Sequence, residues 1–293
     1  MPAGRRQSLL CPKCRKLISA DETRCPHCGV DSPASAVRHA LWTRPFGDPA
    51  LLIRTVILLN VGMFVLSLLI DFGDLRVSLN PLAFLTPAHN SLLLLGESGR
   101  YAIDQIIISI TGIDAIDRLL RWTTLLTANY LHGSLMHIVF NMIALMQIGP
   151  LTIREYGSHR MIVIYTLGGI FGFFLSYIAG IGYTLGASGA ICALIGAMIY
   201  YGKSRGGVYG NAIYRQIGGW AIGLFLFGLL PGINNWAHGG GMAAGALLGF
   251  LMGYRDRSKD TPMHQLLAKG CVTLTVVFLC QSVLFAFYYL VSG

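Results

Sequence analysis

Three short polar clusters interrupt apolar parts of this sequence, and their side chains could together carry out acyl transfer. The clusters are HGSLMHIVFN, GASGA and NNWAHGGG, in chain order. The candidate residues within them are His132, His137, Asn141, Ser188, Asn235 and His238. A serine hydroxyl is a weak nucleophile until a base accepts its proton. We therefore expect Ser188 to be the nucleophile and His238 its base.

The expected catalytic group is a pair of residues, because no carboxylate is placed to orient His238. Between Asp117 and Asp256 the only acidic residue is Glu155, which we expect at the opposite, cytosolic end of its helix. A Ser–His–Asp triad needs a carboxylate hydrogen-bonded to the histidine. The sequence therefore predicts a Ser–His dyad.

Acyl transfer also requires hydrogen-bond donors for the oxyanion that forms on the attacked carbonyl. His137 and Asn141 are four residues apart, so both are expected on one side of a single helix. With the backbone N–H of Ser188, they could supply those donors. The glycines beside Ser188 allow other backbone or a substrate strand to come close.

The elements that must position these residues are membrane-spanning helices. The chain is 54% hydrophobic and 12% charged, whereas soluble domains carry about 25% charged residues. The sequence predicts an all-α polytopic membrane protein, because a spanning helix needs about 20 mostly apolar residues. The expected spans are 51–70, 133–150, 160–180, 187–203, 213–231, 236–254 and 269–291.

Positive charge sets the expected orientation, with the N-terminus in the cytosol and the C-terminus outside. Of the basic residues, only Arg76, Arg100, Arg118 and Arg121 then lie outside. Most of the Lys and Arg residues lie in loops that we expect in the cytosol, and this explains the net charge of +9. No nucleic-acid partner is expected. MPAGRRQSLL lacks the apolar core of a signal peptide, so the first span is expected to stay as an anchor. A bacterial inner membrane suits this layout.

This orientation places all three polar clusters at one depth, near the outer ends of separate helices. Two stripes of small residues at four-residue spacing predict that the fourth and sixth helices pack face to face. The stripes are Gly241, Gly245, Gly249 and Gly253, and Gly189, Ala193 and Ala197. For the outer loop over 71–132, the apolar stretches 92–95 and 106–116 favour short helices in the membrane interface. The alternative is a loop packed on the outer surface of the helices.

Four cysteines near the N-terminus predict a structural metal site. Cys11, Cys14, Cys25 and Cys28 form two Cys-Pro-x-Cys pairs, and four thiolates at such spacing suit tetrahedral Zn²⁺. The pairs resemble the knuckles of a zinc ribbon, with Gly29 in a tight turn. Disulfides between these cysteines are disfavoured in the reducing cytosol. The sequence does not indicate what the ribbon binds. Cys271 and Cys280 are expected to be packing residues in the seventh helix.

The blocks RWTTLLTANYLHGSLMHIVFNM, GASGAICALIGA and NNWAHGGGMAAGALLGF resemble the three signature blocks of the rhomboid protease family. The resemblance implies a six-helix catalytic bundle, with a seventh helix added here. It implies Ser188 as nucleophile, His238 as base, and His137, Asn141 and the Ser188 amide as the oxyanion hole. It also places His132 near the site and Asn235 close to the catalytic histidine. The chain departs from the family at Cys192, where tyrosine is common, and at Trp122-Thr123, where Trp-Arg is common.

The expected organisation is a zinc-ribbon-like segment over 1–30, a linker over 31–50, a catalytic transmembrane domain over 51–254, and a cytosolic loop with the seventh helix over 255–293. The expected activity is cleavage of transmembrane segments of other proteins in the lipid bilayer, with no cofactor for catalysis. Two alternatives remain: a non-catalytic relative that binds transmembrane clients, and a transporter that uses the intramembrane histidines. The lack of intramembrane carboxylates disfavours an aspartyl protease, and the lack of His-Glu-x-x-His disfavours a metalloprotease.

Overall fold

The computed structural model describes residues 8–11, 14, 16–19, 21–31, 46, 48–80, 83–104, 114–230, 232–255 and 260–292. The expected linker over 31–50 and the apolar stretch 106–116 lie mostly outside these residues. The chain divides into two compact units, residues 1–55 and 56–293, and each is described by itself.

The N-terminal unit contains a small antiparallel hairpin followed by a second loop. Strand β1 (Ser8–Leu10) pairs with β2 (Leu17–Ser19), so that Leu9 lies opposite Ile18. In the second loop the Cys25 N–H donates to the carbonyl of Val30 at 2.8 Å, and Gly29 has a φ of +69°. Gly29 therefore forms the tight turn that the sequence predicted, because this backbone region favours glycine.

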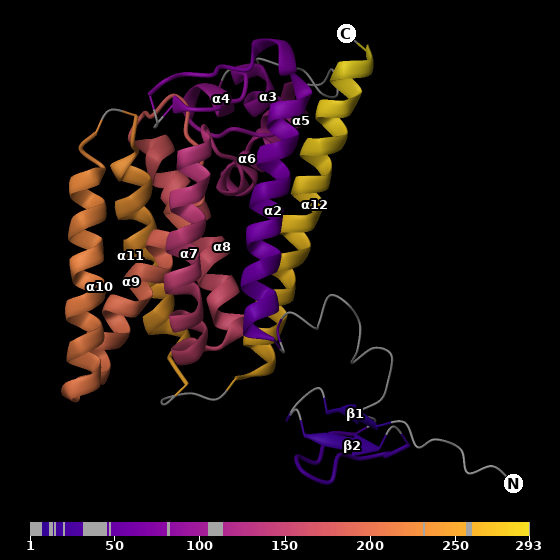
Figure 1. Ribbon diagram of the computed structural model, residues 1–293, viewed down its shortest axis with the longest axis vertical. Coiled ribbons are helices and arrows are strands. Elements are labelled where there is room, and N and C mark those ends of the chain that lie inside the picture. The colour runs from indigo at the N-terminus through magenta and orange to yellow at the C-terminus, as the bar shows by residue number, and fades with distance from the viewer. Residues whose placement is uncertain are drawn as a thin grey trace, which may run out of the picture. The chain divides into compact units, whose positions relative to one another are not determined.

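Seven long helices are present in the described part of the chain, and their order matches the predicted spans (Figure 1). They are α2 (Pro49–Ile70), α7 (Leu135–Tyr156), α8 (Ser158–Ile178), α9 (Ser188–Arg205), α10 (Gly207–Phe227), α11 (Asn235–Met252) and α12 (Pro262–Ser292). Consecutive helices from α7 to α12 run in opposite directions (Figure 1). The starts of α7, α9 and α11 therefore lie at one end of the bundle. The prediction of an all-α bundle of six helices plus a seventh is confirmed.

Three helices extend six or seven residues beyond their predicted bounds. Helix α7 continues through Pro150 to Tyr156, although proline lacks the N–H that an α-helix bonds, and it is followed by Gly157 with a φ of 92°. Helix α10 begins at Gly207, six residues before the predicted start at 213. Helix α12 begins with Pro262, and proline is well tolerated at a first helical position.

Helices α8, α9 and α11 form the centre of the bundle, and α9 also contacts α7 and α10. A Cβ atom on Gly241 would collide with the carbonyl oxygen of Gly189, and one on Gly245 with that of Ala193. The backbones of α9 and α11 therefore meet directly along the two small-residue stripes, as predicted. Such contact requires residues without bulky side chains, which explains why α9 is short and glycine-rich.

The segment between α2 and α7 contains several short helices at the bundle end where α7 begins (Figure 1). They are η1 (Phe72–Asp74), α3 (His89–Leu94), α4 (Arg100–Asp104), α5 (Asp114–Arg121), α6 (Thr124–Thr127) and η3 (Ala128–Tyr130). The side chains of Leu92, Leu94 and Leu95 are buried within the protein. The short helices predicted for this loop are thus present, and these three leucines pack against other parts of the protein.

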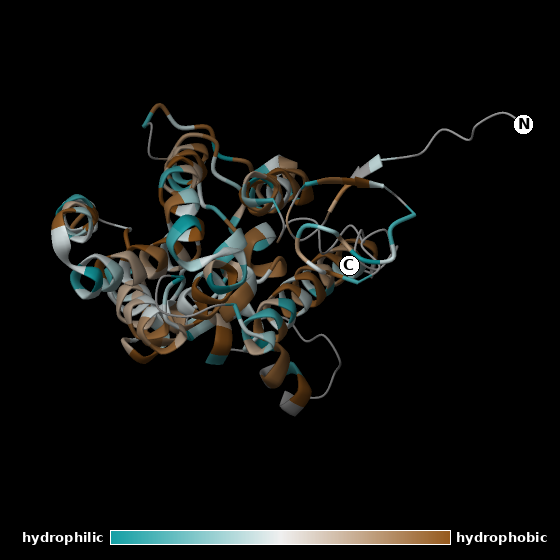
Figure 2. Ribbon diagram, turned by 90° about the horizontal axis from the view of Figure 1, so that it is seen from below, coloured by the Kyte–Doolittle hydropathy of each residue, from teal (hydrophilic) through white to brown (hydrophobic). Residues whose placement is uncertain are grey.

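Four of the described helices are long and apolar enough to cross a membrane, namely α2, α7, α8 and α12. Much of each long helix is made of hydrophobic residues (Figure 2), and large ones such as Phe171, Phe225 and Leu274 are exposed. Exposed apolar surface of this extent is unusual in soluble proteins. The chain is an integral membrane protein. Helices α9, α10 and α11 carry more glycine and polar residues; α9 and α11 pack against α8, and α10 packs against α9.

Helix α12 packs against α8, α6 and α3. Cys271 is buried, as predicted, but the same prediction is wrong for Cys280, which is exposed. The two cysteines are separated by about two and a half helical turns. They therefore lie on opposite faces of α12, and only one of those faces is covered by the bundle.

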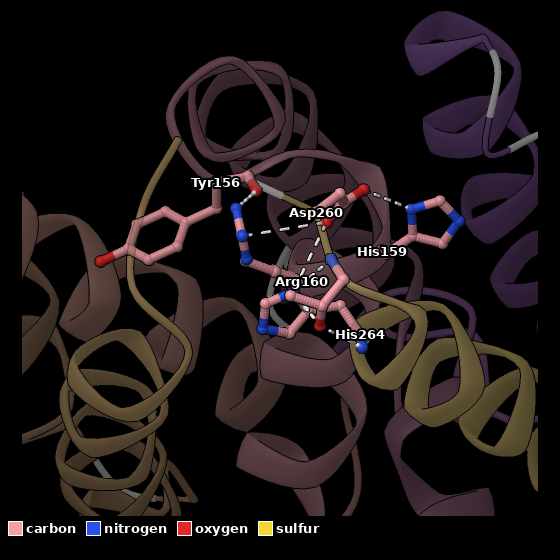
Figure 3. Close-up of polar contacts among 6 residues, drawn as sticks. Tyr156, His159, Arg160, Asp260 and His264 are labelled. Carbon is pink, nitrogen blue, oxygen red and sulfur yellow. Dashed lines mark hydrogen bonds and ion pairs between the residues drawn. The ribbon is translucent and has the colours of Figure 1, made fainter. Parts of the chain in front are cut away.

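A polar cluster joins the start of α12 to the start of α8 (Figure 3). The carboxylate of Asp260 lies 2.8 Å from His159 Nδ1, 3.7 Å from His264 Nδ1 and 4.0 Å from Arg160 Nη2. Arg160 is fully buried and donates from Nη1 to the carbonyl of Tyr156 at 2.9 Å. Asp260 is thus the counter-charge of a buried guanidinium.

We expect Asp260→Asn to lower the free energy of unfolding by about 1–3 kcal/mol, because a buried charge then loses its compensating partner. Thermal unfolding in detergent measures the change. Asp74→Asn, at an exposed carboxylate in η1, is the matched control and is expected to change stability little. Equal effects of the two substitutions would contradict the assigned role of Asp260.

Candidate active site

Ser188 and His238 lie in direct hydrogen-bond contact, although they are 50 residues apart. The Oγ atom of Ser188 lies 2.9 Å from Nε2 of His238. Ser188 is the first residue of α9, and His238 lies in the first turn of α11. Within the described part of the chain, Nδ1 of His238 has no hydrogen-bond partner. Glu155 lies in the last turn of α7. The geometry is that of a pair with no carboxylate behind the histidine.

The close approach of α9 and α11 explains why this contact forms. Gly241, three residues after His238, lies against Gly189, the residue after Ser188. Since neither glycine has a side chain, the first turns of the two helices come within reach of a single hydrogen bond. The packing stripe therefore places the hydroxyl and the imidazole together.

His137 lies beside the loop that leads to Ser188. Its Nδ1 accepts from the backbone N–H of Gly133 at 3.4 Å, so in the neutral ring the proton is on Nε2. A Cβ atom on Gly186 would lie 2.6 Å from that Nε2. The donor nitrogen of His137 therefore faces the backbone two residues before Ser188.

Asn141 and His132 support this region from α7 and from the segment before it. Asn141 donates from Nδ2 to the carbonyl of His137 at 2.9 Å, within its own helix. The ring of His132 packs edge-on against that of His137 with centroids 5.0 Å apart. His132 is fully buried, and within the described residues neither of its ring nitrogens has a hydrogen-bond partner. The contact made by His132 is thus with His137.

The two asparagines before His238 differ in what they contact. Asn235 donates to the carbonyl of Phe225 at 3.5 Å and lies against Gly228, at the end of α10. Asn234, which the sequence analysis did not single out, accepts from the N–H groups of Trp236 and Ala237. Asparagine is a preferred N-cap residue, so its place just before the helix was the available signal.

A buried carboxyl group lies close to the loop before Ser188. The backbone of Ser98 pairs with that of Thr184, with N–H···O distances of 3.1 and 2.8 Å. The neighbouring Glu97 is buried, and its Oε2 lies 3.3 Å from Nδ1 of His89. Burial raises the pKa of the Glu97 carboxyl from 4.5 to about 8, because removal from water disfavours the charged form.

The pKa of Glu97 predicts a pH dependence of stability. The folded state keeps the proton that the unfolded state releases above its ordinary pKa, so stability falls as pH rises from about 5 to about 8. We expect Glu97→Gln to flatten this part of the profile. Melting temperature against pH measures it, with Asp74→Asn as control. If the slope of melting temperature against pH were unchanged in Glu97→Gln, the pH dependence of stability would belong to another group.

Four cysteines in the N-terminal unit form a cluster that could hold a metal ion. The Sγ atoms of Cys11, Cys14, Cys25 and Cys28 all lie within 4.8 Å of one another. Cys11 and Cys28 are 3.6 Å apart at their sulfurs, and Cys14 and Cys25 are 3.7 Å apart. These separations leave room for a central ion bound by four thiolates, and this donor set suits Zn²⁺. Sulfur would fill all four positions, so a zinc ion here would be structural.

Comparison with known proteins identifies the helical unit. Residues 120–255 match the Rhomboid domain family, and this segment contains all six candidate site residues. RHOMBOID-like protein 4 of Arabidopsis thaliana is 38% identical over 132 residues, covering 44% of this chain and 33% of that protein. Rhomboid protease GluP of Bacillus subtilis is 34% identical over 130 residues, covering 43% and 25%.

A longer match is to RHOMBOID-like protein 6, mitochondrial, of Arabidopsis thaliana, which is 30% identical over 174 residues. It covers 56% of this chain and 54% of that protein. The chain thus spans about a quarter to a half of the length of these relatives. Matches to the family domain and to several of its members, together with the helical bundle, lead to one conclusion: residues 120–255 of this chain are similar to the Rhomboid domain.

Proposed function

We propose that the chain is an intramembrane serine protease that cleaves transmembrane segments of other proteins with Ser188 and His238. The observation that carries the proposal is the 2.9 Å contact between Ser188 Oγ and His238 Nε2 at one end of a membrane-embedded bundle. A base within hydrogen-bond reach is what a serine nucleophile requires. The similarity to a protein named as a rhomboid protease supports the same reading.

The reaction would proceed by acyl transfer in two steps. His238 Nε2 takes the proton of Ser188 Oγ as that oxygen attacks the scissile carbonyl carbon, and it then gives the proton to the leaving amine as the C–N bond breaks. Water next attacks the acyl-enzyme, loses a proton to Nε2, and releases the second product as the Ser188 hydroxyl reforms. One peptide bond and one water molecule are consumed, and no cofactor takes part.

Three donors support stabilisation of the oxyanion. As the first residue of α9, Ser188 has a backbone N–H that the helix itself cannot satisfy. His137 carries its proton on Nε2, which faces the loop before Ser188. Asn141 uses one of its two amide hydrogens on the His137 carbonyl, which leaves the other for a ligand. Donors fixed before the reaction are effective because they need no reorganisation.

The active site is proposed to open on the outer side of the membrane, with the N-terminus in the cytosol and the C-terminus outside, as positive charge in the loops indicates. A bacterial inner membrane remains the proposed location. The substrates are transmembrane segments that unwind near their outer end, since a helix must open to present a peptide bond. Fusion of a reporter to either terminus tests the orientation, and an outside N-terminus would contradict it.

The proposal is tested by mixing the purified protein with a reference transmembrane substrate in liposomes. Fragments from the wild type, with the cut mapped to the substrate's transmembrane segment or its edge, are expected. Equal cleavage of the substrate by the wild type and by Ser188→Ala would contradict the proposal. A non-catalytic client-binding protein would bind the substrate without fragments. A transporter would move ions across the liposome membrane, and that movement would survive Ser188→Ala.

Helix α10 offers the route by which a substrate helix could reach the dyad. Its buried residues are Gly210, Ile213 and Ile217, all in its first half. Near its end, Phe227 meets Phe140 of α7 with ring centroids 6.3 Å apart. An aromatic contact thus joins α7 to the end of α10 that lies close to the active site, and separation of the two helices there would admit a substrate from the lipid.

We expect Phe227→Ala to raise the rate of substrate cleavage about two- to tenfold, because an aromatic pair contributes about 0.5–1.5 kcal/mol to the closed arrangement. Phe225→Ala is the control, since Phe225 lies on the same helix and is exposed. Initial rates on a transmembrane substrate measure the effect. If Phe227→Ala cleaved the substrate more slowly than the wild type while Phe225→Ala cleaved it at the wild-type rate, entry of the substrate between α7 and α10 would be contradicted.

A further inference from the structure

Asn234 makes four side-chain hydrogen bonds that reach three separate parts of the bundle. Its Oδ1 accepts from the N–H of Trp236 at 3.1 Å and of Ala237 at 3.2 Å, which caps α11. Its Nδ2 donates to Thr184 Oγ1 at 2.9 Å and to Ser176 Oγ. An asparagine amide has two donor hydrogens and an oxygen that accepts two bonds. All of this capacity is therefore used.

The partners of Asn234 lie just before the two reacting residues. Thr184 is four residues before Ser188, and Asn234 is four residues before His238. The bond between their side chains thus joins the loop that leads into α9 to the start of α11. Ser176 fixes the same point to the end of α8. Ser176 is fully buried and Thr184 nearly so, so water competes little for these bonds.

The loop before Ser188 is otherwise attached mainly to the segment between α2 and α7, where the N–H groups of Arg100 and Tyr101 donate to the carbonyls of Ile181 and Gly182. Thr184 pairs through its backbone with Ser98, and the Gly186 N–H donates to the carbonyl of Ala128 at 2.9 Å. Both of these attach the loop to the segment before α7. The Asn234 side chain attaches it to the helix that carries His238.

We propose that Asn234 is a positioning residue for the Ser188–His238 pair, holding the loop before α9 against the start of α11 so that the hydroxyl meets the imidazole. This inference rests on the proposed function. Proton transfer within the dyad depends on a donor–acceptor distance near 3 Å, and a loose loop would lengthen it. The competing account is that Asn234 only caps α11, and that its loss would simply destabilise the fold.

Asn234→Ser separates the two accounts. Serine is an N-cap residue about as good as asparagine, but its hydroxyl is too short to reach Thr184 and Ser176. Thr184→Val removes the same bond from the other side while keeping the side-chain shape. Asn234→Asp is the conservative variant, because the two hydroxyls can reverse and donate to a carboxylate. Thr152→Val is the matched control, since the buried Thr152 hydroxyl bonds only to Ile148 of its own helix.

The measurements are the rate at which a fluorophosphonate labels Ser188, kcat and KM on a transmembrane substrate, and the melting temperature. We expect Asn234→Ser and Thr184→Val each to slow labelling and lower kcat about tenfold, the equivalent of one lost hydrogen bond. We expect KM to change little, and the melting temperature to fall about as much as in Thr152→Val, which keeps wild-type rates. Asn234→Asp is expected to recover the rate, and the Asn234→Ser/Thr184→Val double variant to be no slower than Asn234→Ser. Wild-type rates in Asn234→Ser, or losses that multiply in the double variant, would overturn the inference.

Amide hydrogen exchange of residues 181–187 distinguishes this inference from the proposed function. Faster exchange there is expected in Asn234→Ser and not in Thr152→Val. If the wild-type protein neither reacts with the fluorophosphonate nor cleaves the substrate, the proposed function is wrong. Faster exchange of residues 181–187 in Asn234→Ser would still support the positioning role of Asn234. Unchanged exchange in Asn234→Ser would overturn that role whether or not the protein is active.

Discussion

Replacement of either dyad residue is expected to abolish cleavage. Ser188→Ala removes the nucleophile and His238→Ala removes the only base within hydrogen-bond reach in the described structure. Losses of about 10⁴- to 10⁶-fold in kcat are typical when a residue of such a unit is removed. Single-turnover rates on a transmembrane substrate measure the change. The fold is expected to persist, because Ser188 is only half-buried and its backbone contacts are unaffected.

The double variant provides a sharper test than either single one. Because the hydroxyl and imidazole act as one unit, Ser188→Ala with His238→Ala is expected to be no slower than Ser188→Ala alone. Ser204→Ala is the matched control, since Ser204 lies near the other end of α9 and its hydroxyl contacts Tyr200. If the rate losses of the two single variants multiplied in the double variant, or if His238→Ala were active, the histidine would not be the base.

Removal of metal is expected to unfold the N-terminal unit. We propose that Cys11, Cys14, Cys25 and Cys28 bind one Zn²⁺, given the mutual proximity of their sulfurs. Structural zinc contributes about 10–16 kcal/mol of binding free energy in small domains. Within the described residues, this unit of two three-residue strands and a second loop has little other core, because its core cluster consists of Cys11, Ile18 and Cys25.

Hydrogen exchange of residues 8–31 with and without a chelator measures this effect, alongside the zinc content of the protein. Exchange is expected to rise to unfolded rates after chelation and in Cys25→Ser. Cys280→Ser is the matched control, since Cys280 is exposed on α12. One zinc per chain is expected in the control and less in Cys25→Ser. Protection that survives complete zinc removal would contradict a structural role for the metal.

The sequence predicted the helices and the meeting of the polar clusters because both follow from strong local signals. Long apolar runs and their charge-flanked loops predict the helices, which the structure confirms. The stripe containing Gly241 and Gly245 predicted the contact with α9, since small residues at this spacing have little other use in a lipid-facing helix. That contact then places Ser188 beside His238.

The features that the sequence did not predict depend on tertiary contacts. Pro150 usually breaks a helix, yet packing carries α7 through it to Tyr156. The stretch 92–95 is apolar because it packs inside the protein, which hydropathy cannot distinguish from membrane contact. The sequence does not distinguish the role of Asn234 from that of Asn235, because only the fold shows which amide reaches Thr184. The sequence likewise does not show which face of α12 the bundle covers, and Cys280 lies on the exposed face.

The central claim, that Ser188 is a nucleophile activated by His238, is tested most directly by mass spectrometry after fluorophosphonate treatment of the purified protein in detergent. The account predicts one adduct, on the peptide that contains Ser188, at full occupancy in the wild type and absent from His238→Ala. An adduct on another serine, no adduct on the folded wild type, or equal labelling of Ser188 in His238→Ala would contradict it.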